Sequence, residues 1–182
     1  MSRRRVQLVL LCEDKQHEAF VRRFFEQAGW HRRAMRIEKS PQGRGAGEQW
    51  VRQRFPKELA ALRRRSVAQL LVAMVDADRS TVEKRLQAFD RSCRQADVPV
   101  RAAEEPVLLL IPRRNVETWI AYLRGEAVDE EREYPKLARE RECSEPVKAL
   151  RRMCDAGQLR PPAPPSLEAA CSAYRTWRKL AG

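Results

Sequence analysis

The stretch QLLVAMVDAD, residues 69–78, is an apolar run that ends in two aspartates. Such a run, without polar alternation, is typical of a central strand of a parallel sheet, which is buried on both faces. Residues 6–12, VQLVLLC, have the same character and are followed at once by Glu13 and Asp14. Residues 107–111, VLLLI, form a third apolar run. These three strands are the frame of the predicted fold.

Helical patterns separate the strands. Apolar residues recur with helical spacing over residues 20–28, which Gly29 ends, and again over residues 51–62 and 82–93. A weaker strand is expected within residues 34–39. Because strands alternate with helices, the sequence predicts an α/β, Rossmann-like domain with a mostly parallel sheet of about four strands flanked by helices.

Three local features refine this prediction. Pro56 is expected to break or restart its helix, because proline lacks the backbone N–H. The stretch SPQGRGAG, residues 40–47, favours a mobile loop over a phosphate-binding P-loop, since no Gly-Lys-Ser/Thr follows it. Asn115 is a candidate N-cap for the apolar helix of residues 116–123.

The pattern changes after the third strand's helix. Apolar strands cease, a short helix is expected from Ser144 to about Gly157, and the proline-rich residues 161–165 interrupt the chain before Ser166 caps a last helix. We therefore predict an α/β domain over residues 1–125 and a C-terminal helical extension over residues 126–182.

Composition narrows the class of protein. With 43% apolar and 34% charged residues the chain is globular, and its net charge is +12. Residues 1–65 hold 17 Lys/Arg against 7 Asp/Glu. Such a field favours a nucleic-acid partner over a membrane, although an Arg-rich solvated surface is the alternative. No apolar run is long enough to span a bilayer and no signal peptide is recognised, so a cytoplasmic location is expected.

The five cysteines are an odd number, lie far apart and form no Cys-x-x-Cys pair. We interpret them as reduced core thiols, with neither zinc nor disulfides expected.

Acidic residues gather where the predicted strands end. Glu13 follows the first strand, Asp76 and Asp78 follow the second, and Glu117 lies just beyond the third. Ligands of parallel sheets bind beyond the carboxyl ends of the strands, so these side chains are expected to share one rim. An extended backbone would direct Asp76 and Asp78 to the same side. Crowded carboxylates without clustered His or Cys favour Mg²⁺ or Mn²⁺ over zinc.

Each of these residues also has a structural interpretation. Asp78 could cap a helix over residues 79–95, and Glu13 and Glu117 lie in first helical turns, where the macrodipole favours a carboxylate. His17 is interpreted as a helix-surface residue rather than a catalytic acid.

Taken together, the strand followed by Glu13 and the strand followed by Asp76-Ala77-Asp78 resemble the TOPRIM domain of topoisomerases, primases and OLD-family nucleases. The segments EDKQHE, residues 13–18, and NVETW, residues 115–119, are most similar to motifs of small TOPRIM-like proteins of bacterial antiphage defence. The resemblance covers roughly residues 5–124. It departs from the family where Asp14 replaces the glycine that usually eases the turn after the first glutamate.

The resemblance implies a Mg²⁺-dependent nuclease. Asp76 and Asp78 would hold the metal, Glu13 would be a further ligand or the general base, and Glu117 would complete the acidic set. Several relatives work with a partner ATPase, which this chain does not itself contain.

Basic residues would bind the substrate. Lys15, Arg113 and Arg114 are expected on the acidic rim to hold phosphate oxygens, and Arg63, Arg64 and Arg65 are expected to add to nucleic-acid affinity. The sequence does not specify the oligomeric state, and a homo-oligomer is one possibility. The alternative function is a non-catalytic nucleic-acid-binding or assembly subunit. A receiver-like or phosphatase-like protein is disfavoured. Such a protein would have a nucleophilic Asp after the first strand and a Thr/Ser and a Lys at later strand ends, and this pattern is missing from the sequence.

Overall fold

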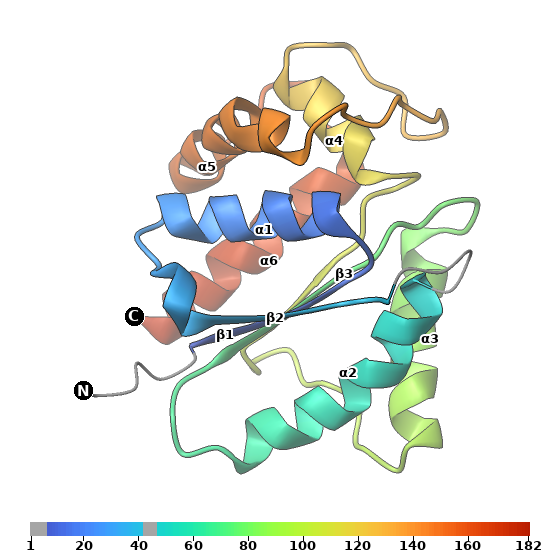
Figure 1. The fold of residues 1–182 in the computed structure, drawn as a ribbon, viewed down its shortest axis with the longest axis vertical. Coiled ribbons are helices and arrows are strands. Elements are labelled where there is room, and N and C mark those ends of the chain that lie inside the picture. Colours follow the sequence, from blue (N-terminus) through green and yellow to red (C-terminus); the bar gives the residue numbers. More distant parts are fainter. Residues whose placement is uncertain (1–6, 42–46) are drawn as a thin grey trace.

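A four-stranded parallel sheet with helices on both faces forms the core of the computed structural model, which describes residues 7–41 and 47–182 (Figure 1). The strand order is β2-β1-β3-β4. The strands are β1 (Leu8–Cys12), β2 (Met35–Lys39), β3 (Leu70–Met74) and β4 (Val107–Leu110). The predicted α/β, Rossmann-like class is confirmed. Most of the glycine-rich stretch, residues 42–46, lies outside the described residues.

Burial explains why the two central strands have the strongest apolar patterns in the sequence. Every residue of β1 and β3 is buried, whereas every residue of the edge strand β2 is partly exposed. Along β1, Leu8 and Leu10 face one core cluster and Val9 and Leu11 face the other. An edge strand has only one neighbour, so β2 needs fewer apolar residues and gives the weaker pattern.

One face of the sheet is covered by α2 (Gly47–Arg64) and α3 (Val82–Gln95) (Figure 1). Phe55 of α2 and Phe89 of α3 meet edge to face, with ring centroids 5.0 Å apart. The predicted break at Pro56 is wrong, because α2 continues through it. Val51 and Leu59 are buried on either side of the proline, and their packing against the sheet offsets the lost backbone hydrogen bond.

The opposite face is covered by α1 (Lys15–Gln27) and α6 (Pro165–Ala181), while α5 (Ser144–Ala156) packs on α1, on α6 and on α4 (Val116–Leu123) (Figure 1). Val147, Leu167 and Tyr174 belong to the same core cluster as Leu10 and Val72. The C-terminal helical extension therefore shares its core with the sheet. Short 3₁₀ helices occupy Arg32–Ala34 and Glu140–Cys143. No helix in the described ranges is long and apolar enough to cross a membrane.

The cysteines depart from the prediction. Cys154 of α5 and Cys171 of α6 form a disulfide with their Cα atoms 5.6 Å apart, so the expectation of five reduced thiols is wrong for this pair. The two helices pack against each other, which brings together cysteines that are 17 residues apart and carry no motif spacing. Cys12, Cys93 and Cys143 are free and buried, as expected.

Two helix starts also differ in detail. Thr81 caps α3 through its hydroxyl, so Asp78 is not the cap and the helix does not begin at residue 79. Asn115 occupies the N-cap position of α4 but makes no capping bond to the helix backbone. Its carboxamide oxygen instead accepts a hydrogen bond from the Thr118 hydroxyl, at 3.1 Å.

Candidate metal centre

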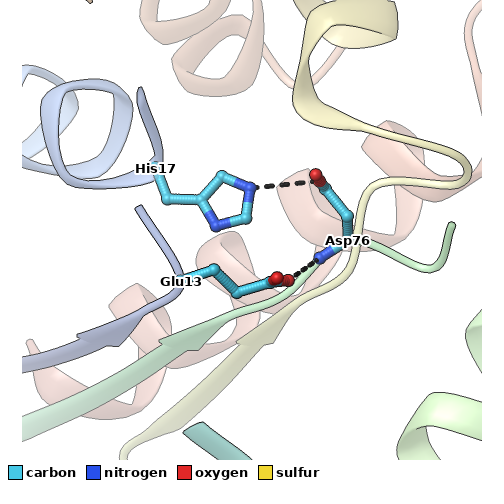
Figure 2. A group of neighbouring side chains, drawn as sticks. All are labelled: Glu13, His17 and Asp76. Carbon is cyan, nitrogen blue, oxygen red and sulfur yellow. Dashed lines mark hydrogen bonds and ion pairs between the residues drawn. The ribbon is translucent and has the colours of Figure 1, made fainter. Parts of the chain in front are cut away.

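Glu13, His17 and Asp76 meet at the carboxyl edge of the sheet (Figure 2). Glu13 directly follows β1, and Asp76 lies two residues beyond β3, the neighbouring central strand. One carboxylate oxygen of each acid and one ring nitrogen of His17 all lie within 4.8 Å of one another. Two of the acidic residues expected at this rim are thus brought together. They are joined by His17, which the sequence pattern had indicated as a helix-surface residue.

Contacts from two other segments hold the Glu13 side chain. The backbone N–H of Asp76 donates a hydrogen bond to Glu13 Oε1 at 2.6 Å. Gly47, the first residue of α2, lies on the other side, where an added Cβ would come within 3.0 Å of Glu13 Oε2 and 3.1 Å of Glu13 Cβ. A larger residue at this position would have to displace the carboxylate. The glycine therefore leaves room for Glu13 between β3 and α2.

Asp14 gives α1 its start. Its Oδ1 accepts a hydrogen bond from the His17 backbone N–H at 2.9 Å, which is an N-cap contact. The backbone of Asp14 is extended, at φ −148° and ψ −178°, a conformation that needs no glycine. An aspartate is therefore accommodated at this position without a glycine, and Asp14 fixes the turn that precedes His17.

His17 lies inside the site, and its interpretation as a helix-surface residue is wrong. Its exposed fraction is 1%, and its Nε2 lies 3.1 Å from Asp76 Oδ1 (Figure 2). Its Nδ1 is buried and has no hydrogen-bond partner in the described part of the chain. The sequence held a signal for this burial, because His17 precedes Phe20, Val21 and Phe24 at the i+3, i+4 and i+7 spacing of one helix face.

The crowding shifts the titration of these groups. Burial raises the pKa of Glu13 to about 7, with His17 opposing and Asp76 reinforcing the increase. Burial also raises the pKa of Glu117 to about 7, and the Asp76 carboxylate adds to the effect. Burial alone would lower the pKa of His17, but the charge of Asp76 and the hydrogen bond to it raise that pKa to about 10. Without a bound cation, His17 is the positive charge of this centre.

Asp78 lies apart from the three-residue cluster. Its φ of +53° lies in the left-handed region, so the extended backbone on which the expectation of same-side projection rested is not present at Asp78. Its side chain is 60% exposed and lies 3.4 Å from Arg85. Burial and the nearby Asp76 carboxylate raise the pKa of Asp78. Asp78 therefore lines the outer part of the site.

Two adjoining pockets make a cleft above this centre. Their volumes are about 390 and 800 Å³, and both are lined by Glu13, Asp14, Glu117 and Lys136. Glu117, in the first turn of α4, is only 6% exposed. The floor of the cleft is acidic, whereas its walls carry cations. These cations are Lys15, Lys39, Arg79, Lys84, Arg85, Arg114 and Lys136.

The three basic residues expected at this rim take different places. Lys15 is exposed in the smaller pocket, and Arg114 lines the larger one, 3.6 Å from Glu133. Arg113 is directed elsewhere, because its guanidinium donates to both carboxylate oxygens of Glu131, at 2.9 and 2.8 Å, and to a backbone carbonyl.

Ser166 supports the loop that carries these arginines. Its hydroxyl accepts hydrogen bonds from the Arg113 backbone N–H at 3.1 Å and from Trp119 Nε1 at 2.8 Å, and it donates to Glu130. The predicted cap role is wrong, because α6 begins one residue earlier, after Pro164. Ser166 thus ties the last helix to the carboxyl edge of the sheet.

Arg63, Arg64 and Arg65 lie at the opposite edge. Arg63 and Arg64 end α2 and Arg65 follows it, shortly before β3 begins at the amino ends of the strands. Arg63 donates to the Glu105 carboxylate, at 2.6 and 2.9 Å, and to two backbone carbonyls, and Arg65 donates to Gln69. The structure therefore does not bring these arginines to the acidic cleft.

No known protein family model, curated protein or solved structure matches this chain.

Proposed function

We propose that this protein is a divalent-cation-dependent nuclease that hydrolyses phosphodiester bonds of DNA or RNA in the cleft above Glu13 and Asp76. One observation carries the proposal. Two carboxylates from the ends of adjacent central strands are held together on the floor of a cleft whose walls carry lysines and arginines. An acidic floor suits a metal ion, and basic walls suit a polyanion.

The residues present fit Mg²⁺ or Mn²⁺. Burial keeps the pKa of Glu13 at about 7, so the carboxylates are held together at a cost that a divalent cation would offset. Glu13 and Asp76 would be its ligands, with Asp78 at the outer side. When bound, such an ion neutralises the scissile phosphate and lowers the pKa of a coordinated water.

The chain's own residues supply the remaining functions. Glu117 has a pKa of about 7, so it can accept and release a proton at neutral pH, as a general base or acid requires. Lys136 and Arg114 stand on the walls where they can bind phosphate oxygens. Asp14 caps the helix that carries His17, and Gly47 leaves room for the Glu13 carboxylate.

The resemblance to small TOPRIM-like proteins also suggests a cellular role and a partner for this nuclease. It supports a cytoplasmic defence effector that works with a partner ATPase encoded nearby. Addition of that ATPase to the nuclease assay described below tests this part separately.

A second candidate is the non-catalytic nucleic-acid-binding subunit. One contact favours it: the imidazolium of His17 lies 3.1 Å from Asp76, so the acidic pair already has an internal cation. In that protein the centre would be a structural ion pair, and nucleic acid would bind without any metal.

A cleavage assay separates the two candidates. We expect labelled single-stranded DNA, double-stranded DNA or RNA to be cut in Mg²⁺ or Mn²⁺ and left intact in EDTA. Glu13→Gln should abolish cleavage, whereas Glu104→Gln, at an exposed glutamate of the amino edge, should not. Salt-dependent binding without cleavage in either metal would establish the binding subunit instead.

A further inference from the structure

The donor set of the centre is mixed, because an imidazole stands beside the carboxylates. Mg²⁺ prefers oxygen ligands, whereas imidazole nitrogen suits transition-metal ions. We infer that His17 is a nitrogen ligand of the cation and that the centre therefore selects a first-row transition-metal ion over Mg²⁺. This inference rests on the proposed metal centre and specifies which ion it takes.

The spacing of the donor atoms fits such an ion. Ligand atoms bound about 2.1 Å from one ion lie roughly 3 Å apart in adjacent positions and about 4.2 Å apart in opposite positions. His17 Nε2 and Asp76 Oδ1 are 3.1 Å apart, as in adjacent positions. The Glu13 oxygen lies within 4.8 Å of the other two donors, so only a small movement would complete the set.

The second ring nitrogen provides independent support. A buried histidine with a purely structural role has hydrogen-bond partners for its ring nitrogens, because an unpaired buried polar atom is costly. His17 Nδ1 is buried without a partner among the described residues, while Nε2 contacts a carboxylate. With Nε2 as the ligand atom, Asp76 Oδ1 would be its neighbour on the ion, and the unpaired Nδ1 shows that hydrogen bonds alone do not account for the burial of this ring. The bound ion takes the place of one ring proton.

The composition of the chain makes the inference unusually testable, because the only other histidine is His31. His31 is exposed at the start of the 3₁₀ helix Arg32–Ala34, where its Nδ1 accepts a backbone hydrogen bond. His31→Gln is therefore a matched control for His17→Gln. All proteins must be purified without a polyhistidine tag.

The measurement is pulsed electron paramagnetic resonance of one equivalent of Mn²⁺ bound to the full chain. We expect ¹⁴N couplings of a coordinated imidazole in the wild type and in His31→Gln, and none in His17→Gln. Calorimetry should show Mn²⁺ binding on the order of 10-fold tighter than Mg²⁺, with most of that preference lost in His17→Gln. Circular dichroism in EDTA checks that the variant is folded.

The inference remains testable even if His17→Gln does not fold. In His31→Gln, His17 is the last imidazole of the chain, so a retained imidazole coupling identifies it as the ligand. Bound Mn²⁺ without imidazole coupling, a coupling that disappears with His31, or no stoichiometric Mn²⁺ binding would overturn the inference. Its failure differs from failure of the nuclease proposal. A chain that cuts nucleic acid in Mg²⁺ without imidazole coupling loses only the inference, and one that shows the coupling but cuts nothing loses only the proposal.

Discussion

The two edges of the sheet differ in how their charged side chains are arranged: the amino edge pairs opposite charges, and the carboxyl edge gathers like charges. At the amino edge, Arg63 pairs with Glu105 and lowers the pKa of that carboxyl. At the carboxyl edge, Glu13 and Glu117 are buried near another carboxylate, and the pKa of each rises to about 7. Both edges belong to one sheet and one chain, so general composition does not explain the difference.

This contrast separates stability from function. Opposite charges paired at a surface add a little stability, whereas like charges gathered in a cleft reduce it. A strained arrangement is retained where it serves a site, and perturbed pKa values cluster at such sites. The proposed function therefore belongs to the carboxyl edge, and each of the following experiments tests its contrast with the amino edge.

The largest effect is expected from Asp76→Asn. The substitution keeps the size of the side chain but removes one anionic ligand, so metal binding by calorimetry and cleavage should fall below detection. Stability in EDTA should change little, because the lost attraction to His17 opposes the relieved repulsion from Glu13. Asp97→Asn is the control, at an exposed site whose φ of +55° suits asparagine. Equal loss in both variants would contradict a specific role for Asp76.

The second effect concerns pH. The folded protein keeps the Glu117 proton up to pH of about 7, whereas the unfolded chain releases it near its ordinary pKa of 4.5. The stability from this group is therefore fully present below pH 4.5 and is lost as the pH rises to about 7, by on the order of 3 kcal/mol. Urea unfolding in EDTA should show this decline in the wild type and a smaller one in Glu117→Gln. Added Mn²⁺ should stabilise the wild type more at pH 8 than at pH 5, and an unchanged pH profile in the variant would refute the assignment.

The third effect concerns nucleic-acid affinity. Lys136 lines both pockets, so Lys136→Gln should remove about one phosphate contact and reduce the slope of log affinity against log salt by about 0.9. Arg64→Gln, at the amino edge, should leave the slope unchanged. Fluorescence anisotropy in EDTA measures both without cleavage. The reverse result would place the nucleic acid at the amino edge, on the arginine cluster of residues 63–65.

The smallest effect is expected from Arg63→Met. The loss of its bonds to Glu105 should cost on the order of 1 kcal/mol at pH 7, while cleavage stays at the wild-type level. Because Arg63 lowers the pKa of Glu105, the stability that this pair provides is present above the ordinary value of 4.5 and lost as the pH falls below it. The difference between variant and wild type should therefore shrink toward pH 3. Arg64→Met is the control in the same urea titrations, and a constant difference at all pH values would argue against the pair.

Much of the fold was predictable because its signals are local. The runs that became β1 and β3 are apolar over five residues, because burial on both faces requires that composition. The run that became β4 is apolar over four residues, although this strand lies at an edge and is buried only in its first half. The acidic residues after β1 and β3 could likewise be assigned to one edge, because parallel strands end on the same side. The position of Arg63 could have been predicted from the same geometry, because a helix that joins parallel strands runs back and ends at the amino edge. This prediction was not made from the sequence pattern.

The sequence by itself thus determined three features: the order of strands and helices, the acidic strand ends and the excess of positive charge. Each can be read from residues and their neighbours along the chain. The packing of the layers decided the rest. It buried His17 against Asp76, 59 positions away, turned Asp78 outward, paired Cys154 with Cys171 and brought Lys136 over the cleft. These contacts join residues from different elements, and their distances depend on how those elements pack, which no periodicity along the sequence records.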